Sequence, residues 1–564
     1  MKLIMVLMKG NAFLFLSAIT LSVLSAFCGI AVISFINDVV SGASINANNI
    51  LALFGLIFSL FILSFCSQSM LTSLGHKVVY RLRLLLSRRL MNTSVERLDL
   101  LGQPAILASL TKDVASISQA FNSLPFVVFG LAVLVSCYGY LLHLSPPFFF
   151  CTVVMTLLSV LIGKVLMTAS RGYKKRVRDN DDFLYESYEG LIKGRNELKL
   201  SKQRREVFYH KSMVPVVQHA LDLETKADRL TVLNGSWVNS SILLLIAMVV
   251  LLYAQFNIGT REDIAGFALA ILFLRSPLAG LVGSLPTLLQ GSVAYTKIQK
   301  LSLAEPDAEM PFAEGKTKKC NIGKPTKYSD NWGSLVLDKV YYQYPSEGGE
   351  SGFCVGPIDF QLNQGELVFW VGGNGTGKST CARLVTGLYA PQSGSVQFAG
   401  EYIDNTNIDF YLSHFSVVFA DFYLFKELIN EAGERPDTEL VEHYLQALSL
   451  EKKVNVNVDG KLNTTKLSQG QRKRLALLLA YLENRSIIVL DEWAADQDPV
   501  FRKVFYTELL PELKARGKTV IAITHDDHYF HIADKVYRID EGKITPFFLE
   551  TAENSSSFHD KEYS

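Results

Sequence analysis

The chain has 564 residues and a formal net charge of +1, which is more sequence than one domain usually holds. Apolar residues make up 49% and charged residues only 19%. This composition excludes a disordered chain and is unusual for a wholly soluble enzyme. The nearly balanced charge gives no sign of nucleic-acid binding. We therefore expect a membrane domain joined to a soluble one.

Long stretches of the first 300 residues carry no charged side chain. The runs 10–36 and 50–75 each exceed the roughly 20 residues that a helix needs to cross the bilayer. The run 114–163 holds no Asp, Glu, Lys or Arg and suffices for two crossings, with Pro146 and Pro147 at the turn. A signal peptide would have a shorter apolar stretch than the first run. Six transmembrane helices are predicted, at about 11–36, 50–74, 120–143, 147–168, 232–256 and 264–290.

Lys and Arg concentrate in the two long segments that follow the second and the fourth predicted span. The remaining loops hold few of them, so the positive-inside rule places these segments and both termini in the cytoplasm. The basic residues alternate with apolar ones at helical spacing, which favours cytoplasmic extensions of membrane helices over a lipid-binding or RNA-binding segment. Each segment contains a break, at 98–104 with Gly102 and Pro104 and at 189–196 with Gly190 and Gly194, where a helix could turn back or a plain loop could form.

Residues 304–334 are predicted to form a linker, because they are rich in Pro, Gly and polar residues and show no hydrophobic period. From residue 335 onward, strand-like and helix-like segments alternate. We therefore divide the chain into a membrane domain over 1–303, the linker and a soluble α/β domain over 335–564.

A glycine-rich segment follows the apolar run 366–371, which is predicted to be a buried strand. It reads GGNGTGKST and fits the phosphate-loop pattern, in which backbone N–H groups surround phosphate oxygens. Lys378 would reach the terminal phosphates and Ser379 could bind Mg²⁺. The residues expected at the nucleotide are Gly372, Gly373, Asn374, Gly375, Thr376, Gly377, Lys378, Ser379 and Thr380.

Two acidic residues follow a second apolar run, 486–490. Asp491 stands at the carboxyl end of the predicted strand, where Mg²⁺ beside a phosphate loop needs a protein ligand. Glu492 is then placed to polarise the attacking water. The predicted fold is an all-α polytopic membrane domain with six transmembrane helices, followed by an α/β P-loop NTPase domain.

The sequence LSQGQ precedes this strand, and His525 follows a later one at 519–524. The order of phosphate loop, LSQGQ, strand with Asp-Glu and late His resembles the nucleotide-binding domain of ATP-binding-cassette (ABC) proteins. The resemblance implies ATP and Mg²⁺ as cofactors and a γ-phosphate contact for His525. It also implies that the LSQGQ signature contacts the ATP held by the opposing subunit, through Leu467, Ser468, Gln469, Gly470 and Gln471.

The same resemblance assigns two further residues to the ATP site and shows one departure. Asp498 matches the aspartate of the D-loop, and Tyr344 matches the aromatic that stacks on adenine, with Tyr341 and Tyr342 as rivals. Ala420 stands where family members usually carry Gln. The neighbouring Asp421 is a candidate for a weak metal ligand or a water contact, and its alternative role is to cap a surface turn.

Six spans followed by one such domain resemble an ABC exporter half-transporter, in which the two breaks would be coupling helices. Because each site in the family needs two domains, a homodimer is implied. The segments VFADFYLF and DEWAADQDP resemble a bacterial branch that exports cyclic peptides and siderophores. The predicted function is export of a peptide-like metabolite across the bacterial inner membrane. The alternatives are a multidrug or lipid exporter and a non-pumping ATP-gated regulator, which would not need an intact catalytic set.

Arg275 lies inside the sixth predicted span, about 16 Å from its start and near the bilayer midplane. A charge there is unfavourable against lipid, so we expect Arg275 to face the central cavity and to bind an anionic cargo. Two other placements compete with this one: the side chain could snorkel to an interface, or it could bond helix carbonyls within the bundle.

Overall fold

The computed structural model describes residues 12–40, 46–256, 260–301, 303–304, 331–345, 352–457 and 460–548. They belong to two compact units, one formed by residues 1–91 and 103–303 and the other by residues 92–102 and 304–564. Most of the predicted linker lies outside the described residues, as do both termini.

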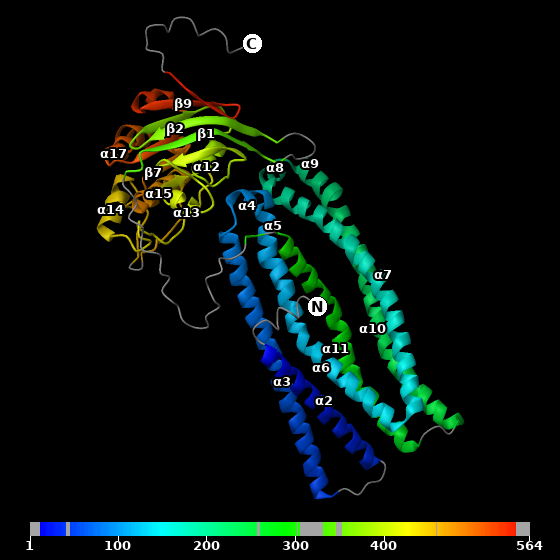
Figure 1. Cartoon of the computed structure of the whole chain (residues 1–564). Helices are drawn as coiled ribbons and strands as arrows, with labels where there is room; N and C mark the ends of the chain where they lie inside the picture. Colours follow the sequence, from blue (N-terminus) through cyan, green and yellow to red (C-terminus); the bar gives the residue numbers. More distant parts are fainter. Residues whose placement is uncertain are drawn as a thin grey trace. The chain divides into compact units, whose positions relative to one another are not determined.

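The first unit is helical (Figure 1). Within the described ranges, six of its helical stretches are long and apolar enough to cross a membrane, which confirms the predicted fold class. Some helices run far beyond the apolar runs, because the basic segments continue them as predicted. The helices are α2 (Ala12–Val40), α3 (Ala47–Met91), α5 (Gln103–Ala108), η1 (Ser109–Asp113), α6 (Val114–Leu144), α7 (Pro146–Lys193), α8 (Arg195–Leu200), α9 (Lys202–Val207), η2 (Phe208–Met213), α10 (Val214–Phe256) and α11 (Arg261–Lys300).

These helices pack closely in pairs, of which α6 with α11 and α7 with α10 are the most extensive (Figure 1). Glycines allow the close approach of α6 and α11. A Cβ atom on Gly130 would lie 2.9 Å from the carbonyl oxygen of Pro277, and one on Gly291 would overlap the Cβ of Ala120. Small residues at such contacts are typical of membrane helices, which have no hydrophobic driving force between them.

The helix path is interrupted at both predicted breaks. Helix α4 (Val95–Leu101) is capped by Ser94 and ends at Gly102, whose φ of 74° favours glycine. Helix α7 ends before Gly194, and the short α8 follows. Residues 92–102 belong to the same compact unit as the α/β domain.

The second unit contains two sheets. One is antiparallel, in the order β2-β1-β4-β5, and the other has the order β10-β9-β3-β8-β7-β6 and is parallel except for the β9–β10 pair. The strands are β1 (Ser334–Gln343), β2 (Cys354–Asn363), β3 (Leu367–Val371), β4 (Ser393–Phe398), β5 (Glu401–Tyr402), β6 (Phe415–Val418), β7 (Ile487–Asp491), β8 (Thr519–Ile523), β9 (Lys535–Asp540) and β10 (Lys543–Pro546).

The larger sheet has a buried cluster on each face. Along β3, Leu367 and Phe369 belong to one cluster and Val368 and Trp370 to the other, because successive side chains of a strand point to opposite faces. The helices of this unit are α12 (Lys378–Val385), α13 (Ile408–Leu412), α14 (Thr438–Ala447), α15 (Gln469–Glu483), η3 (Trp493–Asp496), α16 (Pro499–Val504), η4 (Phe505–Leu509), α17 (Leu510–Ala515) and η5 (Asp527–Ile532).

Candidate nucleotide-binding and catalytic site

Three motifs that are far apart in the sequence meet at one edge of the larger sheet. Strands β3, β8 and β7 are adjacent, parallel and fully buried. Their carboxyl ends therefore lie side by side, which is where parallel sheets bind ligands. The phosphate loop follows β3, Glu492 follows β7, and His525 comes shortly after β8.

The phosphate loop has the backbone shape that its glycines permit. Gly375 and Gly377 have φ values of 78° and 100°, a region that other residues rarely adopt. Helix α12 begins at Lys378, directly after the loop. The ammonium group of Lys378 is buried and donates to the carbonyl oxygens of Gly372 and Gly373, at 2.9 and 2.8 Å. The loop and its lysine thus lie together at the start of a helix, where phosphate binds favourably.

A pair of oxygen-bearing side chains lies beside the loop. The hydroxyl of Ser379 donates to Oδ2 of Asp491 at 2.9 Å, while the buried Oδ1 of Asp491 has no hydrogen-bond partner among the described residues. Burial raises the pKa of Asp491, and the Ser379 hydrogen bond opposes that rise. A hard cation such as Mg²⁺ prefers oxygen ligands of this kind and commonly shares them with phosphates. The residues present therefore fit a nucleotide-bound Mg²⁺.

Glu492 lies between the lysine of the phosphate loop and His525. Its Oε1 is 3.5 Å from Nζ of Lys378 and 3.4 Å from Nε2 of His525. The backbone of Glu492 is left-handed, with φ 49° and ψ 38°, a conformation that costs a non-glycine residue about 1–2 kcal/mol. Its N–H donates to the carbonyl oxygen of Ile523, at the end of β8, at 3.1 Å.

Lys473, which the sequence did not reveal as a site residue, holds Glu492 from the other side. It is 3% exposed, and its Nζ donates to the Glu492 carbonyl oxygen at 2.5 Å and pairs with Asp496 at 2.6 Å. The indole of Trp493 is buried and donates to the Lys473 carbonyl oxygen at 2.7 Å. The strained backbone of Glu492 is thus fixed by bonds from both β8 and α15.

The aromatic residues near the loop include the predicted Tyr344. Its hydroxyl lies 3.1 Å from Oγ1 of Thr380. Its rival Tyr342 is buried and donates to Glu96, so its ring is not available for stacking on a base. Tyr341 bonds Sγ of Cys354. Phe353, which sequence reasoning missed, is 43% exposed and lies against Gly377, so it is a further candidate for the adenine contact.

The signature residues span the start of α15, with Leu467 and Ser468 before its first residue, Gln469. Ser468 caps this helix in a reciprocal capping box with Gln471, and the carbonyl oxygen of Gly470 accepts from Gln497. In the described part of the chain, no hydrogen bond joins these residues to the phosphate loop. Asp498 caps α16 and pairs with Arg474 at 2.6 Å. The N–H of Phe501 and the Arg474 charge lower the pKa of Asp498.

Asp421 lies next to Ala420, and Ala420 is the residue at the position where the family usually has Gln. Its carboxylate is 79% exposed and lies 3.8 Å from Nη2 of Arg383. Arg383 also pairs with Asp99 of α4, at 3.4 Å, and Asp99 accepts a hydrogen bond from Tyr389 at 2.8 Å. Arg383 therefore links the segment at Asp421 to α4, within the same compact unit.

Removing the Asp99 carboxylate tests this link. Asp99→Ala is expected to speed amide hydrogen exchange of residues 95–101 by about fivefold to tenfold. A hydrogen bond to a charged group contributes about 1.5–3 kcal/mol to stability, and solvent screening reduces this contribution because the Asp99 side chain is about half exposed. Basal ATPase should stay within about twofold. Glu96→Gln is the matched control, since its amide can still accept from Tyr342. Unchanged exchange in Asp99→Ala would contradict the link.

In the membrane unit, Arg275 of α11 lines a cavity together with residues of α7 and α10. Its Nη2 donates to Oδ1 of Asn239 on α10 at 3.0 Å. Arg275 thus belongs to the cavity lining, while its guanidinium bonds the neutral side chain of Asn239, which is not one of the lining residues.

Two family models match the sequence. The model described as the ABC transporter transmembrane region covers residues 11–276, and the model described as ABC transporter covers residues 355–495.

Several proteins are similar over most of the chain. The ATP-binding protein SyrD of Pseudomonas syringae pv. syringae is 36% identical, over 83% of this chain and 82% of its own length. The ATP-dependent lipid A-core flippase of Haemophilus influenzae is 26% identical, over 87% of this chain and 83% of its own length. The similarity to the ATP-dependent permease MDL1 of Candida albicans is narrower, with 27% identity over 47% of this chain and 38% of the permease.

Proposed function

Because the chain belongs to the ABC transporter family, with a membrane domain fused to an ATP-binding domain, we propose that it works as a homodimer in the bacterial inner membrane. In this proposal ATP hydrolysis drives the export of a peptide-like secondary metabolite. Both termini and both basic segments would lie in the cytoplasm. The expected resemblance to an ABC exporter half-transporter is confirmed, and ATPase-coupled transport follows from it.

One observation carries the catalytic part of the proposal: Lys378 and His525 both lie within about 3.5 Å of the same oxygen of Glu492. Lys378 would bind the β- and γ-phosphates, His525 would contact the γ-phosphate, and Glu492 would polarise the attacking water. Ser379 and Asp491 would hold Mg²⁺, which neutralises phosphate charge when bound. A non-hydrolysing regulator would need none of this arrangement.

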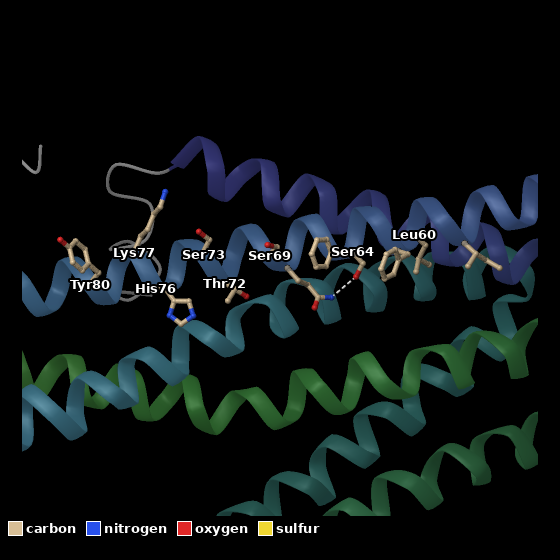
Figure 2. A pocket seen from close by; sticks show the side chains of 12 residues that line it. Leu60, Ser64, Ser69, Thr72, Ser73, His76, Lys77 and Tyr80 are labelled. Carbon is tan, nitrogen blue, oxygen red and sulfur yellow. Dashed lines mark hydrogen bonds between the residues drawn. The ribbon is translucent and has the colours of Figure 1, made fainter. Parts of the chain in front are cut away.

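The homodimer is supported by features of both units. The signature residues form no hydrogen bond with the phosphate loop in the described chain, so a second copy would have to bring its signature to this ATP. In the membrane unit, one face of α3 presents polar side chains along a hollow of about 1,180 Å³ (Figure 2). Gln68 donates there to Ser64 at 3.0 Å, and Thr72 and His76 follow along the same face. Lipid would satisfy these groups poorly, whereas a second protein surface could cover them.

The cargo has two candidates. A peptide-like metabolite is favoured by the resemblance of two segments around the ATP site to peptide and siderophore exporters. A lipid is the second candidate, because relatives named lipid A-core flippases match most of this chain.

Reconstitution of the purified chain in liposomes tests the function. With ATP outside, a fluorescent apolar peptide should accumulate in the lumen through transporters whose ATP-binding domains face outward, and Glu492→Gln should abolish accumulation. ATP-driven movement of a labelled lipid without peptide movement would assign the lipid function. A chain that binds ATP but never hydrolyses it would favour the regulator.

A further inference from the structure

Helices α7, α10 and α11 line a cavity of about 470 Å³ within the membrane unit. This volume is typical of ligand pockets, which measure roughly 300–1,000 Å³. Most lining side chains are apolar, among them Met155 of α7, Ile242 of α10 and Leu278 of α11. The cavity therefore suits a molecule with a substantial apolar part.

The charged side chains of the cavity are all cationic. They are Lys164 and Arg171 of α7 and Arg275 of α11, and among the described residues no Asp or Glu belongs to the lining. The ion pairs that the structure describes in this unit involve other residues. Charges of this kind usually face water or a paired group, so three cations without an acidic partner give the cavity a positive charge that suits an anion.

Asn234 of α10 is an independent sign of a polar ligand. Its side chain lines the cavity and is only 9% exposed, yet its Oδ1 has no hydrogen-bond partner in the described structure. Gly163 leaves room for this amide, since a Cβ atom there would lie 3.0 Å from Oδ1. A buried amide oxygen is nearly always hydrogen-bonded, so a ligand N–H or O–H group would complete it.

We propose that this cavity binds an amphipathic anion, with its carboxylate or phosphate at Arg275, Lys164 and Arg171 and an N–H or O–H donor at Asn234. The inference rests on the proposed export function, because this molecule would be the cargo. A guanidinium binds carboxylate or phosphate through two parallel hydrogen bonds. An apolar peptide with a free carboxylate and an anionic lipid share this chemistry.

A matched pair of probes tests the site. Both are fluorescent dodecanoyl pentapeptides of the same apolar sequence, one with a free C-terminal carboxylate and one with a C-terminal amide. Binding is measured without ATP, on the full chain in phosphatidylcholine nanodiscs. The acid should bind about tenfold tighter than the amide. Arg275→Gln should remove that preference and Arg275→Lys should retain part of it. Arg178→Gln, an exposed position of α7 outside the cavity lining, should leave it intact.

Equal binding of the two probes to the native chain would overturn the proposal, and this comparison needs no variant to fold. An equal loss in Arg178→Gln and Arg275→Gln would also overturn it, because a general surface attraction would then suffice. Phosphatidylglycerol is added as a competitor. If it displaces the acid probe from the native chain but not from Arg275→Gln, the result supports the site and identifies a lipid phosphate as the anion. If the acid preference is found but ATP moves no cargo, export fails and the anion site stands. If ATP moves cargo but the two probes bind equally, the export function stands and the anion site fails.

Discussion

Replacing Glu492 by Gln is expected to lower ATP turnover by about 10²–10⁴-fold, because the amide cannot act as a base toward the attacking water. ATP should still bind, since Lys378, Ser379 and Asp491 remain in place. The backbone N–H of Glu492 donates to the Ile523 carbonyl oxygen and its own carbonyl oxygen accepts from Lys473, and neither bond depends on the side-chain charge. The variant should therefore keep its local structure and retain ATP.

Steady-state hydrolysis and ATP binding, measured on the same purified variant, check this result. Glu451→Gln is a suitable control, because Glu451 is exposed in a turn outside the site. Near-native hydrolysis in Glu492→Gln would show that Glu492 is not the main catalytic group and would point to His525.

Replacing Lys473 by Met should lower the turnover rate by roughly 10-fold to 100-fold with little change in KM for ATP. The long apolar side chain fills similar space but cannot bond the Glu492 carbonyl or pair with Asp496. Glu492 would then leave its left-handed conformation more readily, and a displacement of about 1 Å from the reactive position costs up to about 10²-fold in rate. Lys473 does not contact the phosphate loop in the described structure, so nucleotide binding should survive.

The rate and the KM of Lys473→Met should be compared with those of Lys473→Arg and of Lys466→Met. The arginine keeps the charge and should recover part of the rate. Lys466 is exposed beside the signature, so its replacement controls for loss of a positive charge in this region. If turnover in Lys473→Met equals that of the Lys466→Met control, the bond to the Glu492 carbonyl is not needed for catalysis.

The parts of the site that the sequence predicted are those in which chemistry and backbone shape occupy one short segment. The phosphate loop carries its own glycines and lysine, and Asp491 and Glu492 directly follow a buried strand. The six membrane helices could likewise be predicted from the sequence, because an uncharged run of sufficient length is a local property. In each case the physical cause lies within about 30 consecutive residues.

The missed residues act through contacts between distant segments. Lys473 lies on α15 and reaches the residue after β7, and no local pattern distinguishes it from the neighbouring basic residues of that helix. Phe353 and Gly377 likewise meet only in the fold. The cavity joins Lys164 of α7 to Asn234 of α10 and Arg275 of α11, and sequence periodicity does not fix how three long helices are rotated against one another.

Asp421 illustrates the same limit. Its position next to Ala420 suggested a metal or water contact, whereas in the structure its exposed carboxylate lies near Arg383. Its role at the ATP site therefore stays a prediction.

Mixed dimers provide the most direct test of whether two copies of this chain share each ATP site. Two differently tagged chains are co-expressed in the Glu492→Gln background, one with Lys378→Ala and the other with Ser468→Arg, and mixed dimers are purified through both tags. Neither variant alone should occlude ATP, because every site of its homodimer has one defective half. The mixed dimer should occlude one ATP, in the site formed by the intact phosphate loop of one chain and the intact signature of the other. No occluded ATP in the mixed dimer, or full occlusion in the Ser468→Arg homodimer, would contradict shared sites.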